Sequence, residues 1–166
     1  MAGSLPRLLG KSARCPRNGN QATKEALMTQ TITPYLLYEE VDAALEFLDR
    51  AFGFKEHVRL TGPEGYVNHA ETRLGDAAVY LGDPGDHYQS PKRLGQETFS
   101  LYVLVEDVDA HYERAKAAGA EILAEPEDQE YGDRRYSAAD PEGHHWFFAQ
   151  PTRDTEPEEW GATVTG

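Results

Sequence analysis

The side chains best suited to chemistry stand at alternate positions of one short segment, His69, Glu71 and Arg73. Alternate side chains of a β-strand point to the same face of the sheet, so a strand would project these three together. An imidazole and a carboxylate spaced in this way can chelate a transition metal or act as an acid–base pair. They can also be ordinary polar neighbours, with Glu71 paired to Arg73 or Arg135 and His69 hydrogen-bonded nearby. The residue types alone leave these three interpretations open.

This segment belongs to a body that is internally duplicated. Residues 33–43 align with residues 100–110 at a constant offset of 67, and each stretch predicts a strand followed by the start of a helix. Apolar spacing predicts helices over about 41–52 and 108–118, with Asp107 as the N-cap of the second and Glu40 as a poorer cap of the first. Three short strands are predicted after each helix: 55–60, 66–74 and 77–81, then 121–124, 134–139 and 144–150.

The predicted order is therefore β-α-β-β-β, repeated once. A helix can cover one face of each small sheet and leave the other face bare. We expect an α+β fold of two tandem βαβββ modules that form a curved mixed sheet around a central cleft. Module one is expected over 31–82, a linker over 83–97 and module two over 98–150, together making one domain over 31–150.

The two ends of the chain differ from this body in composition. Residues 1–30 hold five basic residues and one acidic residue without helical or strand periodicity, which predicts a disordered basic leader. The sequence around Met28 suggests a natural start there, with an organelle transit peptide as the alternative. Residues 151–166 are predicted to be an acidic, disordered tail with few apolar anchors, of which Trp160 is a candidate to dock on the body.

Charge and composition exclude several classes of function. The 166 residues carry 29 acidic and 16 basic side chains, a net charge of -13, and the 136 residues after the leader carry -17. Phosphate backbones would be repelled, so nucleic acid is excluded as a partner. No window approaches the roughly 20 apolar residues of a membrane span, and Cys15 is a single cysteine. We therefore expect a soluble, cytoplasmic protein with no membrane partner.

The body resembles the vicinal oxygen chelate superfamily, which includes glyoxalase I, bleomycin-resistance proteins and extradiol dioxygenases, and within it the PhnB-type branch. The resemblance covers residues 32–150. It is carried by Ile32-Thr-Pro-Tyr-Leu, Ala51-Phe-Gly-Phe, His69-Ala-Glu, Leu74-Gly-Asp, Leu81-Gly-Asp, Val105-Glu-Asp-Val-Asp-Ala, Ala117-Ala-Gly-Ala, Glu127-Asp-Gln-Glu-Tyr-Gly-Asp-Arg and Asp140-Pro-Glu-Gly-His-His-Trp. It implies the expected fold and, because superfamily members are commonly dimers, a homodimer.

The resemblance also implies where a metal would bind. Metal-dependent members use His and Glu side chains at four positions, which fall here on Thr33, Tyr80, Ser100 and Phe147. None of these is a histidine or a carboxylate, and a phenyl ring cannot donate to a metal. We therefore predict no metal and no other cofactor at the usual site. A relocated divalent metal around His69, Glu71 and His145 is the alternative.

The expected cleft is aromatic with a few polar groups, which is typical of a pocket for a flat, partly apolar molecule. The predicted ligand-binding residues are Tyr35, His69, Glu71, Arg73, Tyr80, Tyr102, Tyr131, Arg135, His145 and Phe147. The favoured function is metal-free binding of a small, partly aromatic organic molecule. The alternatives are a lyase, epimerase or dioxygenase that uses His69, Glu71 and His145, with His69 and Glu71 as the catalytic candidates, and a scaffold without a small-molecule role.

Overall fold

The computed structural model describes residues 32–165, so the predictions for the leader and for Met28 lie outside the described residues. Module one contains β1 (Tyr35–Leu37), α2 (Val41–Phe47), a π-helical turn η1 (Leu48–Phe52), β2 (Lys55–Thr61), β3 (Val67–Leu74) and β4 (Ala77–Gly82). A short helix, α3 (Pro91–Leu94), lies in the linker. Module two contains β5 (Ser100–Leu104), α4 (Val108–Ala117), β6 (Glu121–Asp128), β7 (Asp133–Ala139) and β8 (His145–Pro151).

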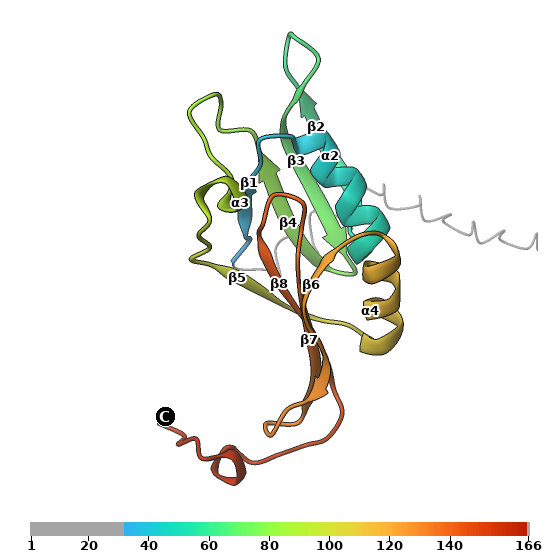
Figure 1. Cartoon of the computed structure of the whole chain (residues 1–166), viewed down its shortest axis with the longest axis vertical. Coiled ribbons are helices and arrows are strands. Elements are labelled where there is room, and N and C mark those ends of the chain that lie inside the picture. Colours follow the sequence, from blue (N-terminus) through green and yellow to red (C-terminus); the bar gives the residue numbers. More distant parts are fainter. Residues whose placement is uncertain (1–31, 166) are drawn as a thin grey trace, which may run out of the picture.

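The duplication predicted from the sequence is confirmed in the topology. The strands form two four-stranded sheets with the same order, β1-β4-β3-β2 and β5-β8-β7-β6. The strand β1 pairs parallel with β4, and β5 pairs parallel with β8. The other pairs are antiparallel. The predicted α+β class with two βαβββ modules is therefore correct. Figure 1 shows the two sheets one beyond the other, with α2 and α4 on the same side.

The two modules share one hydrophobic core. The helix α4 packs against η1, and the ring of Phe52 at the end of η1 lies 5.5 Å from that of Trp146 and 4.7 Å from that of Phe148. All three side chains are fully buried. Phe52 thus belongs to module one in sequence and packs in both modules, which share one core.

The helix starts are fixed in two different ways. Asp107 caps α4 as predicted, because its carboxylate accepts the backbone N–H of Ala110 at 2.9 Å. Glu40 makes no side-chain cap at the start of α2. There the carboxylate of Glu142 from module two accepts the backbone N–H groups of Glu39 and Glu40, at 2.8 and 2.9 Å. A cap supplied by the other module ties α2 to module two.

The region predicted as an acidic, disordered tail makes specific contacts from residue 152 onwards. The Thr155 hydroxyl donates to the backbone oxygen of Tyr131 at 2.7 Å, and Arg153 donates to that of Glu130 at 2.6 Å. A 3₁₀ turn, η2 (Pro157–Trp160), then places the Trp160 ring 6.1 Å from that of Tyr131, edge to face. Composition predicts only that the acidic groups of this segment are solvated. It does not reveal the backbone oxygens that the segment contacts, because they are distant in the sequence.

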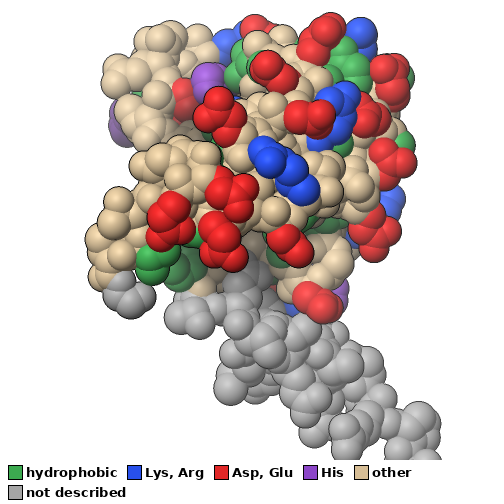
Figure 2. All heavy atoms as spheres, turned by 90° about the horizontal axis from the view of Figure 1, so that it is seen from below, with side chains coloured by type: hydrophobic (Ala, Val, Ile, Leu, Met, Phe, Trp, Pro, Cys, Tyr) green, Lys and Arg blue, Asp and Glu red, His purple; other side chains and the backbone are tan. Residues whose placement is uncertain are grey.

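Two further properties of the whole molecule follow from the described residues. No helix within residues 32–165 is long and apolar enough to cross a membrane. Acidic side chains are spread over the face seen in Figure 2, with a few basic ones among them. This distribution agrees with the -17 charge that the sequence assigns to the residues after the leader.

Candidate functional site

Each sheet has one face covered by a helix and one face without a helix, which we call its open face. Strand alternation assigns the side chains: Leu36, Ala70 and Thr72 are buried on the covered face of the first sheet. Their neighbours in sequence therefore point to the open face. The predicted ligand-binding residues on the open face of module one are Tyr35, His69, Glu71, Arg73 and Tyr80, and those of module two are Tyr102, Arg135, His145 and Phe147.

The open face of module one carries a connected cluster around His69. The Tyr35 hydroxyl lies 3.1 Å from Nδ1 of His69, and Nε2 of the same ring lies 3.8 Å from the Glu71 carboxylate. The Tyr80 ring meets both neighbouring rings edge to face, at 6.3 Å from Tyr35 and 5.5 Å from His69. Gly82 lies under the Tyr35 ring, where a Cβ atom would collide with the phenol. The predicted His69–Glu71 proximity is thus present, supported by two tyrosines.

The open face of module two carries a second cluster, around Phe147. The Arg135 guanidinium lies over the Phe147 ring at 4.6 Å from its centroid, within the range of a cation–π contact. The Tyr102 ring lies 6.3 Å from that of Phe147, and its hydroxyl donates to Asp133 at 2.5 Å. Burial, this hydrogen bond and the proximity of Tyr131 together raise the pKa of Tyr102, so its phenol stays protonated at neutral pH.

The two clusters occupy equivalent places in the duplicated fold. The pair Tyr35 and Tyr80 on β1 and β4 corresponds to Tyr102 and Phe147 on β5 and β8. In the antiparallel register, His69 faces Gly82 across β3 and β4, just as Arg135 faces Ala149 across β7 and β8. The sequence offset of 67 does not reveal this last match, because the loops before β3 and β7 differ in length.

Two of the hollows mapped on the described surface border the open faces, and another lies at the module junction beside α4. A hollow of about 620 Å³ lies at the module junction, lined by residues of the β3–β4 turn, β5 and α4 that include His111 and Arg114. Tyr35 borders a hollow of about 400 Å³ with Leu94 and Phe99, and His145 borders one of about 290 Å³ with Leu123. An open sheet face encloses little volume by itself, because no helix or strand within residues 32–165 covers it.

The residues at the positions implied for a metal do not fit a divalent ion. Tyr80 and Phe147 lie on the open faces, Ser100 begins β5, and Thr33 precedes β1. Within residues 32–165, no three His, Cys, Asp or Glu side chains gather in a way that could hold an ion. His145 comes from the second sheet, whereas His69 and Glu71 share β3 of the first.

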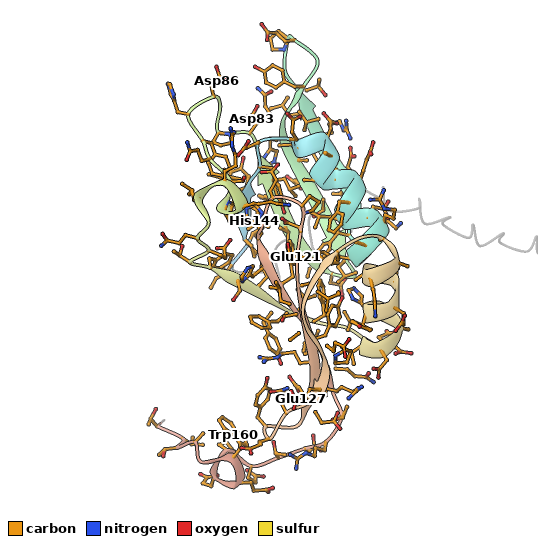
Figure 3. The ribbon with its side chains drawn as sticks, in the orientation of Figure 1. Asp83, Asp86, Glu121, Glu127, His144 and Trp160 are labelled. Carbon is orange, nitrogen blue, oxygen red and sulfur yellow. The ribbon has the colours of Figure 1, made fainter. Side chains whose placement is uncertain are left out.

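A buried polar cluster at the module junction has no counterpart in the sequence predictions. Asp140 is buried and accepts hydrogen bonds from the Tyr38 hydroxyl at 2.7 Å and the Trp146 indole at 3.2 Å, and its carboxylate lies 3.2 Å from Nδ1 of His144. Burial favours neutral His144, but the bond and charge of Asp140 outweigh it and raise the pKa of His144. His144, labelled in Figure 3, is buried, and its ring lies 4.5 Å from that of Tyr38 in module one.

Comparison with known proteins identifies the family. Residues 31–148 match the model of the Glyoxalase/Bleomycin resistance protein/Dioxygenase superfamily. The chain belongs to this superfamily. An uncharacterized protein of Mycobacterium bovis is 35% identical over 139 residues, which are 81% of this chain and 91% of the relative. An uncharacterized protein of Mycobacterium tuberculosis is also 35% identical over 139 residues, 81% of this chain and 82% of the relative.

Solved structures of superfamily proteins share the fold. TioX from Micromonospora sp. ML1 is 33% identical with a TM-score of 0.62, over 74% of this chain and 98% of that one. TnmS3, described as an antibiotic binding protein from Streptomyces sp. CB03234, is 20% identical with a TM-score of 0.57, over 74% of this chain and 99% of that one. At that identity the second likeness shows the fold alone, because one fold supports many functions.

Proposed function

We propose that this superfamily member binds a small, flat, partly aromatic organic molecule without a metal ion. The observation that carries the proposal is that aromatic residues stand at two of the positions where metal-dependent members have His or Glu. These residues, Tyr80 and Phe147, present their rings on the open faces. Rings with a few polar groups suit stacking against a planar ligand. TnmS3, described as an antibiotic binding protein, is an example of this fold with a binding function of this class. Within the superfamily, the motifs quoted above favour the PhnB-type branch.

The proposal includes a homodimer, because each open face needs a cover. The faces carry exposed apolar side chains: Tyr35 is 51% exposed, Tyr102 47% and Leu104 61%. Exposed apolar surface of this kind is typical of binding or association sites. A second copy of the chain would turn an open face into an enclosed one, and the ligand would then lie between two sheets.

A second candidate, an acid–base enzyme, is favoured by one observation. The Tyr35 hydroxyl, the His69 ring and the Glu71 carboxylate form a row in which protons could be exchanged with a bound molecule. In this hypothesis Glu71 accepts the proton relayed by His69. Glu71→Gln would then abolish turnover while ligand affinity stays unchanged, and activity would not depend on added metal.

Direct binding measurements on aromatic face variants test the main proposal. Naphthalene, quinoline and acridine derivatives are titrated into the full-length protein by calorimetry, with a chelator present throughout. Phe147→Ala and Tyr102→Ala should each weaken binding several-fold, since one ring contact contributes about 1 kcal/mol. Tyr66→Ala, which removes an exposed tyrosine outside both clusters, is the control. Equal weakening in all three variants, or binding restored only by added metal, would contradict the proposal.

A further inference from the structure

Arg135 is the cationic side chain on the open face of module two. It lies on the central strand β7, is half-buried, and its guanidinium rests on the Phe147 ring at 4.6 Å from the centroid. Phe147 is in turn flanked by Tyr102, with the two rings tilted by 32°. The positive charge of the Arg135 guanidinium therefore lies against an aromatic surface.

The electrostatic surroundings of Arg135 differ from those of its neighbour in sequence. Its neighbour Arg134, on the opposite face of β7, pairs with Asp109 at 2.9 Å and with Asp128 at 3.2 Å. Glu127, labelled in Figure 3, stands opposite Arg135 in the β6–β7 register. Among residues 32–165, however, no carboxylate lies at ion-pair distance from the Arg135 guanidinium. Other described basic residues, such as Lys92 and Arg114, lack such a partner as well. What sets Arg135 apart is its place against Phe147 on the open face, where a bound anion would reach it.

The geometry of the contact defines the chemistry of that anion. A guanidinium lying on a phenyl ring keeps its N–H donors in its own plane, where they match the two oxygens of a carboxylate. A ligand bound at this edge lies in or near the plane of the guanidinium. A planar molecule that carries its negative charge in the plane of its ring system can pair with the edge and extend beside the rings of Phe147 and Tyr102.

We infer that the ligand is a planar aromatic acid, bound through its carboxylate or ionised phenol to the N–H edge of Arg135. This inference rests on the proposed function and names the class of its ligand. The net charge of -17 on the residues after the leader repels anions at a distance. The local contact with Arg135 must overcome this repulsion, so Arg135 determines which aromatic molecules bind.

A matched pair of probes separates charge from ring stacking. Calorimetry on the full-length protein compares 2-naphthoate with 2-naphthamide, which has the same ring system and no charge. The wild type should bind the acid about tenfold more tightly than the amide, because charge-assisted bonds to a guanidinium are strong. Arg135→Gln should weaken binding of the acid about tenfold and leave binding of the amide unchanged. Arg135→Lys, which keeps the charge and loses the two-pronged edge, should weaken it by less.

Arg134→Gln is the matched control, since it makes the same change of charge one residue away on the helix-covered face. It should leave the affinity for both probes unchanged. Equal affinity of the wild type for acid and amide would overturn this inference and leave the proposed function standing. The inference would also be overturned if Arg135→Gln and Arg135→Lys each lowered the affinity for the acid and for the amide by the same factor. Arg135 would then contribute to the form of the binding surface and would not bind the charge. If the wild type bound neither probe, both proposals would be contradicted.

Discussion

At the scale of single residues, His111 shows how a titratable group joins the modules. It is buried on α4, with Nε2 at 3.1 Å from the Phe52 carbonyl oxygen and Nδ1 at 2.6 Å from the Tyr136 hydroxyl. A carbonyl only accepts, so Nε2 carries the proton and Nδ1 accepts from Tyr136. Burial lowers the pKa of His111 to about 4. The folded state therefore holds this ring neutral where the unfolded chain would protonate it.

This arrangement predicts a loss of stability in mild acid. Because the pKa of His111 is lower in the folded than in the unfolded state, the unfolded chain binds more protons as the pH falls below about 6.5. The free energy of unfolding should drop by about 2 kcal/mol between pH 7.5 and pH 5 through His111 alone. Urea denaturation at both pH values, with His111→Gln as the non-titrating variant, measures the difference. Parallel pH profiles for the two proteins would refute this role.

The sequence predicts where a side chain lies when its partners are local, and fails when they belong to the other module. Alternation along a strand suffices to place Tyr35, His69 and Tyr102 on the open faces, as the register shows. The burial of His111 and His144 depends on Phe52 and Tyr38, which lie in the other module. Local spacing holds no information about such contacts, so the sequence does not reveal them.

At the scale of elements, the two modules differ in how their helices start and end. Spacing predicts one helix over about 41–52; α2 ends at Phe47 and continues as the π-helical turn η1. Gly53 ends this turn in the left-handed conformation, with φ of 80°. The strand β6 runs to Asp128, four residues beyond the prediction, with two register shifts on the way. Such irregularities follow from pairing with β7, which short-range patterns do not describe.

The cap that Glu142 provides for α2 predicts an unequal effect of two carboxylate deletions. Glu142→Ala should lower the free energy of unfolding by about 1–2 kcal/mol, because it leaves two backbone N–H groups at the helix start without their acceptor. Glu40→Ala, at the N-cap position itself, should change it by less than about 0.5 kcal/mol. Chemical denaturation at neutral pH measures both. A larger cost for Glu40→Ala would show that the cap is local after all.

At the scale of the whole molecule, the fold can be predicted from the sequence, whereas the way in which the open faces become an enclosed binding site cannot. The duplication at an offset of 67 predicts two equivalent sheets, and both are present. Each sheet leaves a face with aromatic side chains exposed in the single chain. In the proposed dimer a second chain covers these faces, and the pattern of one chain carries no direct signal for such a cover.

Native mass spectrometry of the purified full-length protein tests the central claim most directly, because one spectrum reports subunit number, metal and retained ligand. We predict a dimer with no stoichiometric metal, and a mass shift on adding 2-naphthoate that is the same with and without a chelator. A bound divalent ion in every chain, whose removal by the chelator also abolishes ligand binding, would contradict the account.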